Sequence, residues 1–327
     1  MLSILSSGFL LFGLSYLYGV TGTTNLEAIY AALKAGSAAK MPAILGIAAI
    51  MMIAGLGFRL TAVPFHFYAP DVFQGAPNSV AAMLSFVPKV AGFVALYRVL
   101  AVTTTGGDWS LASVSQPLLW WLAVLTMFLG NLMALLQSDI RRMLAFSSVS
   151  HAGYMLVGFV VGLKGTTSFS GIDSLLFYLA VYGAMTIGAF AVLGAISTSE
   201  RRIGAINDLA GLSRSQPGMA LLLTLFLFSL TGLPPTAGFL GKLNLFLSAW
   251  NAGGDDGRWL AIWLAVNAAI GAWYYLRVIR EMYLSDPVEA ITDAPKPAAL
   301  VALGLCTAAT LGLFFVPGLL WQVIQKI

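Results

Sequence analysis

Residues 79–100 form the run SVAAMLSFVPKVAGFVALYRVL, which is apolar over the ~20 residues that a helix needs to cross a bilayer and carries Lys89 near its middle. A cation at the centre of a membrane costs at least ~2.5–3.5 kcal/mol on insertion scales. About ten residues separate Lys89 from either end of the run, a helix rise of ~15 Å that a lysine stem cannot span. The run therefore predicts a membrane-spanning helix whose lysine faces protein or water, where it is a plausible proton carrier.

The composition of the whole chain points to the same class. Of 327 residues, 59% are hydrophobic and 9% are charged, whereas a soluble domain carries about 25% charged residues. A soluble fold is thereby excluded, and an all-α, polytopic membrane helical bundle is predicted. The excess of 17 Lys and Arg over 13 Asp and Glu lies mostly in loops, which indicates topology rather than nucleic-acid binding. One cysteine, Cys306, and two distant histidines favour neither a disulfide nor a bound metal or iron–sulfur cluster.

Apolar stretches of spanning length predict about nine transmembrane helices. The first lacks the basic start and the small-residue cleavage pattern of a signal peptide, so we interpret it as a spanning helix. The stretches are 1–19, 42–67, 79–102, 117–136, 147–164, 173–197, 218–249, 259–284 and 298–322.

Basic residues in the loops predict the orientation in the membrane. Arg141 and Arg142 follow the fourth stretch, and Arg201, Arg202 and Arg214 follow the sixth. The loop after the eighth stretch is flanked by Arg277, Arg280 and Lys296. The opposite side carries Lys34, Lys40, Arg98, Lys164, Arg258 and Lys326, some of them with Asp108, Asp255 or Asp256. The positive-inside rule places the arginine-rich loops in the cytoplasm. We expect the N-terminus on the outside.

Two of the stretches are interrupted. In the second, Pro64 follows Arg59 by five residues, and in the seventh, Pro234 and Pro235 precede Lys242. A proline inside a helix removes a backbone hydrogen bond, and the freed carbonyl group needs protein or water partners in a membrane. A break of this kind can be a simple packing kink. Here, however, both breaks lie beside a cation, which favours discontinuous helices that present charge inside the membrane.

Lys242 and Arg59 share the apolar setting of Lys89. The Gly241–Lys242 pair is not a phosphate loop, because Leu243 stands where Ser or Thr is needed. Arginine stays protonated, so Arg59 can hold a field but is a poor relay. All 13 acidic residues fall in loops or at helix ends. Either the lysines are largely neutral or a carboxylate comes from a part outside this chain.

Two histidines and one aspartate complete the candidates. His66 lies seven residues after Arg59, two turns away on about the same face if the helix continues, and it could shuttle protons or act as a structural histidine at the membrane interface. His151 stands near the start of the fifth stretch, where a structural hydrogen-bonding role is favoured over a relay. Asp71 is expected to cap or order the broken segment.

Three runs resemble one family of membrane proteins. They are FRLTAVPFHFYAPDVFQGAPNSVAAMLSFVPKVAGF (58–93), GNLMALLQSDIRRMLAFSSVSHAGYMLVG (130–158) and SLTGLPPTAGFLGKLNLF (229–246). They are similar to subunit N of respiratory NADH–quinone oxidoreductase (complex I), and the resemblance extends over essentially the whole chain. The DVFQGAP segment distinguishes that subunit from the L and M subunits and from Mrp-type cation/proton antiporters, which share the fold.

The resemblance implies a fold of fourteen helices with two inverted five-helix repeats, of which this chain matches helices six to fourteen. Residues 1–103 would be the remainder of the first repeat, 117–284 the second repeat and 298–322 the C-terminal helix. The five missing helices include the one whose glutamate pairs with the seventh-helix cation in the family. The chain would then be a split-gene product, a mis-started reading frame or a truncated relic.

The resemblance also implies roles. Lys89 matches the central lysine of the eighth helix, Lys242 the lysine of the broken twelfth helix, and His66 the histidine of the VPFH motif, while Arg59 replaces the usual seventh-helix lysine. The implied function is proton translocation in the inner (plasma) membrane, with NADH, flavin, iron–sulfur clusters and quinone held by partner subunits and no cofactor in this chain. A cation/proton antiporter subunit, which the lack of an embedded acidic site weakens, and a non-pumping scaffold remain the alternatives.

Overall fold

The computed structural model describes residues 2–37, 42–104, 112–162, 171–197, 203–252, 254–286 and 297–326. Within these ranges the chain forms helices and turns, with one antiparallel β-bridge between Asp139 and Ala205. The longer helices are α1 (Leu2–Thr21), α4 (Pro42–Arg59), α6 (Asn78–Thr104), α7 (Ala112–Leu135), α8 (Ile140–Gly162), α9 (Gly171–Ile196), α11 (Pro217–Thr231), α12 (Ala237–Asn251), α13 (Gly254–Leu284) and α14 (Pro297–Phe315). The shorter ones are α2 (Leu26–Ala32), the π-helix η1 (Leu33–Ser37), α5 (Ala69–Gly75), the 3₁₀ helix η2 (Ile206–Leu209), α10 (Leu212–Ser215) and α15 (Gly318–Ile324).

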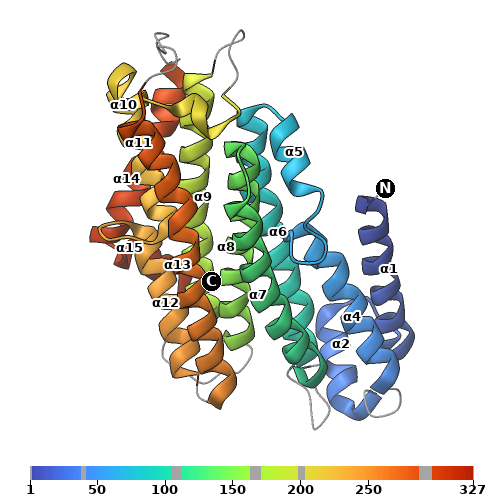
Figure 1. The fold of residues 1–327 in the computed structure, drawn as a ribbon. Helices are drawn as coiled ribbons and strands as arrows, with labels where there is room; N and C mark the ends of the chain where they lie inside the picture. The colour runs from blue at the N-terminus through green and yellow to red at the C-terminus, as the bar shows by residue number, and fades with distance from the viewer. Residues whose placement is uncertain are drawn as a thin grey trace.

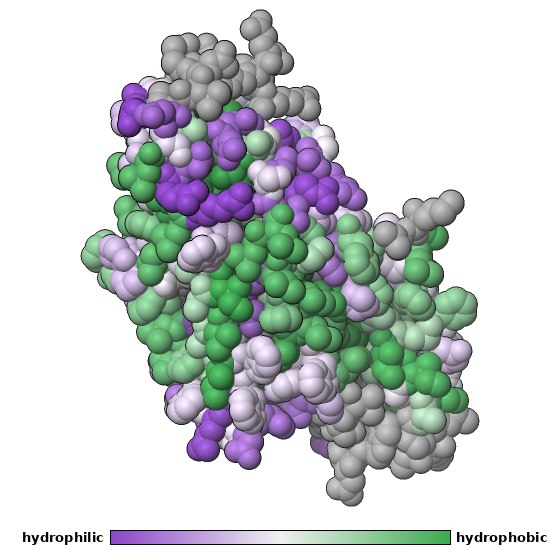
Figure 2. Space-filling view, viewed as in Figure 1, coloured by the Kyte–Doolittle hydropathy of each residue, from purple (hydrophilic) through white to green (hydrophobic). Residues whose placement is uncertain are grey.

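The helices form an elongated bundle with their long axes roughly aligned (Figure 1). In the described ranges, seven helices are long and apolar enough to cross a membrane: α1, α6, α7, α8, α9, α13 and α14. Two further spans are divided, one into α4 and α5 and the other into α11 and α12. Figure 2 shows apolar residues across the middle of the bundle and hydrophilic residues towards its ends. The predicted polytopic all-α bundle with two broken spans is thereby confirmed.

Helix α8 lies at the centre of the bundle. It contacts α5, α6, α7, α9, α12 and α13, and Figure 1 shows it between α7 and α9. From Ile140 to Val161, every residue of α8 except Arg142 is buried. A helix that is surrounded by protein has no lipid-facing side, so the polar residues between Ser147 and His151 can find protein partners.

The arginine-rich loops meet at one end of the bundle. Asp139 accepts hydrogen bonds from the backbone N–H groups of Arg141 and Arg142 at 2.8 and 2.9 Å, which caps the start of α8. The Arg142 side chain pairs with Asp71 of α5 at 2.6 Å, as expected for a residue that orders the broken segment. Arg141 donates to the carbonyl of Ile203 at 2.9 Å. Of the loop residues used to predict orientation, Arg201, Arg202, Lys296, Lys40, Lys164 and Asp108 lie outside the described residues.

The helix directions correct the expected side of the N-terminus. The Asn78 side chain at the start of α6 donates to Ser197 just after α9, and the bonds around Asp139 place the end of α7 and the start of α8 at the same end. Tracing back through α4, α1 begins at this arginine-rich end too (Figure 1). From the start of α1, the chain crosses the membrane four, six and eight times before it reaches the loops after the fourth, sixth and eighth spans. Each of these numbers is even. The start of α1 therefore lies on the arginine-rich side.

The first broken span ends earlier than the predicted stretch 42–67. Helix α4 stops at Arg59, and Thr61 adopts a left-handed conformation with φ of 57°. The N–H of Val63, freed by the break, donates to the Thr126 hydroxyl of α7 at 3.1 Å. A side chain of a neighbouring helix thus replaces the lost helical bond. Because the helix does not continue, Arg59 and His66 do not share one helix face.

The second broken span divides the predicted stretch 218–249. Gly232 ends α11 with a left-handed φ of 88°, and Pro234 and Pro235 follow without N–H donors. The chain then turns back closely, because a Cβ atom on Gly238 of α12 would lie 1.9 Å from the Ser229 carbonyl oxygen of α11. Glycine at this position is required for the two half-helices to meet.

Candidate functional site

Lys89 lies inside the bundle, on α6, with 2% of its surface exposed. Its ammonium group donates to the Ser148 carbonyl of α8 at 2.6 Å and to the hydroxyl of the same residue. The Nζ atom lies 5.1 Å from the centre of the Tyr182 ring of α9. No ion pair joins Lys89 to an acidic side chain within the described ranges. A carbonyl, a hydroxyl and an aromatic face can accommodate both an ammonium and a neutral amine, so this lysine can exchange a proton.

His151 lies in the middle of α8, because the helix begins at Ile140 rather than at residue 147. It is 1% exposed. Its Nδ1 lies 2.6 Å from the Tyr178 hydroxyl and its Nε2 lies 3.0 Å from the Tyr275 hydroxyl, which also bonds the Ser147 hydroxyl. A neutral imidazole donates through one nitrogen and accepts through the other, so this ring can pass a proton between two hydroxyl groups.

Lys242 of α12 occupies the gap left by the second helix break. It is 7% exposed, and its Nζ donates to the carbonyls of Leu230 and Thr231 at 2.8 and 2.9 Å. These carbonyls end α11 and have lost their helical partners. The ammonium group also faces the negative end of the α11 dipole. The Tyr154 ring of α8 lies 4.9 Å from the Nζ atom.

Two aromatic rings connect the lysines to the central histidine. The Tyr182 ring centre lies 5.1 Å from Lys89 Nζ and 5.2 Å from the His151 ring. The Tyr154 ring centre lies 4.9 Å from Lys242 Nζ and 5.4 Å from the His151 ring. Lys89, His151 and Lys242 thus form one buried line across α6, α8 and α12, which we call the central line.

Arg59 and His66 lie outside the central line. Arg59 is exposed at the end of α4, yet its Cβ lies 3.6 Å from where a Cβ on Gly92 would stand, one turn beyond Lys89 on α6. His66 is 5% exposed, and its ring contacts Phe146 of α8 with a centroid distance of 6.3 Å. Within the described chain, the Nδ1 atom of His66 has no hydrogen-bond partner. Such a buried nitrogen is suited to binding a water molecule.

The hydroxyl groups that surround the central line are functional candidates that were not predicted from the sequence. Two signals could have found them. The run SSVSHAGY (147–154) places small polar residues within an otherwise apolar helix, and Tyr178 and Tyr182 are four residues apart in α9, so they lie on one helix face.

Asn131 of α7 fixes the ring that faces Lys242. Its amide donates to the Tyr154 hydroxyl at 3.0 Å and its carbonyl accepts from the Tyr274 hydroxyl at 2.9 Å. The same amide lies 3.2 Å from the Asn267 carbonyl of α13. Because these groups are buried and satisfied by one another, the Tyr154 ring has one defined position.

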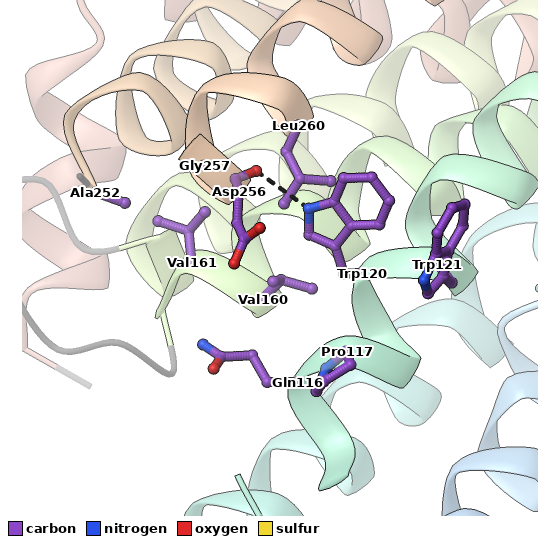
Figure 3. A pocket seen from close by; sticks show the side chains of 10 residues that line it. All are labelled: Gln116, Pro117, Trp120, Trp121, Val160, Val161, Ala252, Asp256, Gly257 and Leu260. Carbon is purple, nitrogen blue, oxygen red and sulfur yellow. Dashed lines mark hydrogen bonds between the residues drawn. The ribbon is translucent and has the colours of Figure 1, made fainter. Parts of the chain in front are cut away.

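A cavity of about 250 Å³ opens at the end of the bundle away from the arginine-rich loops (Figure 3). Trp120 and Trp121 of α7 lie along it, and the Trp120 indole donates to the backbone carbonyl of Asp256 at 3.1 Å. The cavity contains no residue of the central line. Asp256 is its one acidic lining residue, and no cluster of three His, Cys, Asp or Glu side chains occurs in the described ranges. This donor set does not suit a bound metal cation.

A helical membrane bundle with two divided spans and a line of buried basic side chains defines the class of antiporter-like membrane proteins. Comparison with known families agrees with this class. The chain belongs to the family described as "NADH:quinone oxidoreductase/Mrp antiporter, TM", which matches residues 1–271.

Individual relatives narrow the similarity. The chain is 43% identical over 331 residues to NADH-quinone oxidoreductase subunit N of Trichlorobacter lovleyi, covering 100% of this chain and 64% of that protein. It is 32% identical to a chain of respiratory complex I from Thermus thermophilus with bound aureothin, with a TM-score of 0.79 and coverage of 98% and 66%. A chain of the membrane-bound sulfane sulfur reductase, an archaeal respiratory membrane complex, is 25% identical, with a TM-score of 0.86 and coverage of 99% and 63%.

These comparisons also define the extent and the location of the chain. It spans 64% to 65% of the length of the first curated relatives that it matches. Its apolar helices and its similarity to these bacterial membrane subunits identify it as a multi-pass protein of the inner membrane.

Proposed function

We propose that this chain forms the proton-translocating part of a membrane subunit of a respiratory NADH–quinone oxidoreductase. Electrons pass from NADH to quinone in other subunits, which hold the flavin, the iron–sulfur clusters and the quinone. This chain contributes proton movement and no redox chemistry. The observation that carries the proposal is the central line, in which Lys89, His151 and Lys242 are buried with neutral partners and joined by two tyrosine rings.

Lys89 acts as the central relay and Lys242 as the exit-side group. Ser148 holds the Lys89 ammonium, and the adjacent Ser147 begins a hydrogen-bonded path through Tyr275 to His151. Hydroxyl groups and a neutral imidazole can each accept one proton while they release another, so the path can conduct without a fixed carboxylate. His151 lies between the two lysines in this arrangement, with the Tyr154 ring between it and Lys242, and we assign it the role of a relay.

Arg59 and His66 have supporting roles. Arg59 carries a permanent charge, and its Cβ lies next to the turn of α6 that follows Lys89. Its role is to bias the protonation of that lysine through space. His66 offers its unpaired Nδ1 to water and helps to carry or order protons beside the first break.

The partners are other membrane subunits of a complex I-like assembly and the lipid bilayer. A change of charge in a neighbouring subunit alters the proton affinities of the lysines, and water chains connect them to the two sides. Residues 1–103 supply the remainder of a first repeat, 117–284 a second repeat and 298–322 a C-terminal helix, with the arginine-rich end in the cytoplasm.

The test is Lys89→Ala in the assembled complex. NADH-driven proton pumping into inverted membrane vesicles, followed with a pH-sensitive dye, should be abolished while the subunit still assembles. Lys326→Ala is the matched control, because Lys326 is exposed near the C-terminus, and it should pump normally. Coupled pumping by assembled Lys89→Ala would show that the assignment is wrong.

The same vesicles separate the two other functions. Sodium-dependent proton exchange without quinone reduction would identify a cation/proton antiporter subunit, although the described spans offer no acidic cation site. Unchanged pumping in both Lys89→Ala and Arg59→Ala would identify a non-pumping scaffold.

A further inference from the structure

A second cavity, of about 570 Å³, opens on the outer face of the bundle between α6, α9 and α14. It is open towards the membrane, because Met83 in its lining is 63% exposed and only 11% of the residues in the α14 span are buried. It lies at the arginine-rich end, since it reaches Asn78 at the start of α6 and Ser197 just after α9. The cavity of Figure 3 is therefore a different one, at the opposite end of the bundle.

The polar end of this second cavity holds a buried charge. Arg141 of α8 lines the cavity and is 7% exposed. Its guanidinium group donates three hydrogen bonds of 2.9 to 3.2 Å to the carbonyls of Ile203 and Gln74, which leaves two of its five N–H donors free. Within the described ranges, no ion pair joins Arg141 to an acidic side chain. A buried cation without a counter-ion is costly, so the cavity favours an anion.

The start of α6 adds positive potential at the same place. Asn78 and Ser79 are the first two residues of this helix, and both line the cavity. Backbone N–H groups in the first turn of a helix have no helical acceptor, and the helix dipole makes this end positive. A helix start beside a guanidinium group is suited to a phosphate group, which both can bind through N–H donors.

The side chain of Asn78 indicates what accompanies the phosphate. Its Oδ1 atom is buried and has no hydrogen-bond partner in the described chain, while its Nδ2 donates to Ser197 at 3.5 Å. An amide oxygen only accepts, so the bound group must offer an N–H or O–H donor. The described lining contains no Asp or Glu to pair with an ammonium group. A neutral hydroxyl therefore fits better than an amine, whose charge would repel that of Arg141.

The rest of the cavity is apolar and leads towards the middle of the membrane. Gly194 and Ile187 of α9 both line it, and the helix rise between them is ~10 Å. Phe190 and Ala302 belong to the same wall. A basic end at the membrane surface is thus continuous with an apolar groove between spanning helices. This pattern suits a phospholipid, whose acyl chain fills the groove, better than a free anion.

We propose that this cavity binds one phosphatidylglycerol molecule from the leaflet on the arginine-rich side. The phosphodiester lies against Arg141 and the start of α6, a glycerol hydroxyl donates to the Asn78 Oδ1 atom, and an acyl chain lies in the groove along α9. The lipid neutralises the Arg141 charge and links α6, α9 and α14 at the membrane surface. The site is separate from the central line and does not depend on the proposed proton translocation.

Photochemical cross-linking in the assembled complex tests the site. The complex is reconstituted into phosphatidylcholine vesicles with a trace of phosphatidylglycerol or phosphatidylethanolamine, each carrying the same diazirine on its acyl chain, and adducts are mapped by mass spectrometry. Phosphatidylglycerol should label the α9 and α14 peptides that line the cavity at least ~5-fold more strongly, as expected for one uncompensated arginine. Equal labelling by the two lipids, or no labelling of these peptides, overturns the proposal.

An excess of inorganic phosphate at constant ionic strength separates a lipid from a free anion. Labelling by phosphatidylglycerol should persist, because free phosphate has no acyl chain to bury in the groove. Loss of the label would show that the polar end takes a free anion, and it would overturn the lipid assignment.

Two substitutions test the groove and the polar end separately. Ala302→Trp fills the groove from α14 and should reduce labelling several-fold. Leu300→Trp is the matched control, because Leu300 is 48% exposed on another face of the same helix, and it should label as the wild type does. Arg141→Gln should remove the preference for phosphatidylglycerol. Unchanged labelling in assembled Ala302→Trp overturns the site, whether or not Arg141→Gln assembles.

Discussion

Replacing Lys242 with methionine tests the link between the helix break and the buried cation. The side chain keeps a similar volume, but the carbonyls of Leu230 and Thr231 lose the donor that lies 2.8 and 2.9 Å away. A buried acceptor left without a partner costs about 1–3 kcal/mol, so two carbonyls should lower the free energy of unfolding by about 2–6 kcal/mol. The break itself explains why no backbone N–H can replace the lysine.

The assay is unfolding of the purified subunit in mixed micelles of rising dodecyl sulfate content, followed by far-UV circular dichroism. Leu243→Met is the matched control, because this neighbouring residue makes no capping bond and its substitution should cost less than ~1.5 kcal/mol. A Lys242→Met variant that unfolds within about 0.5 kcal/mol of the wild type would refute the capping argument.

Lys242→Arg separates stability from proton transfer. A guanidinium group has five N–H donors and can still bond both carbonyls, so stability should remain close to the wild-type value. Arginine does not release its proton under ordinary conditions, so pumping should be lost. Normal pumping by this variant would show that Lys242 does not need to release a proton.

Three further predictions concern single contacts. Gly238→Ala should lower the free energy of unfolding by about 1–3 kcal/mol or more, because the added Cβ would stand 1.9 Å from a backbone oxygen. The control is Gly218→Ala, whose Cβ meets nothing within 4 Å. This control should be neutral or stabilising in the same micelle titration. Asp139→Ala removes the acceptor at the start of α8 and should cost about 0.5–2 kcal/mol, and an unchanged unfolding midpoint would contradict the capping role. Tyr275→Phe removes the hydroxyl 3.0 Å from His151 and should slow dye-detected proton pumping by roughly 100-fold with assembly intact; wild-type pumping rates would exclude this path.

Local physical rules explain which features could be predicted. The spans follow from apolar length, because a chain inside a membrane must satisfy its backbone groups within its own helix. The helix breaks follow from the prolines, which lack an N–H donor. The start of α8 was misplaced because its polar first turns are stabilised by Asp139 and by contacts to distant loops, such as that between Arg141 and Ile203. A hydropathy pattern does not contain those contacts.

Apolar length, prolines and embedded lysines in the amino-acid sequence establish that this protein crosses the membrane several times, that two spans are broken, and that lysines lie too deep to reach the interface. Which side chains meet follows from the tertiary structure. It placed His151 between Lys89 and Lys242 and left Arg59 on the outside of the bundle. The physical reason is that burial depth follows from position along one helix, whereas the partners of a buried charge come from helices distant in sequence. The proposed proton route therefore depends on how α6, α8, α9 and α12 pack.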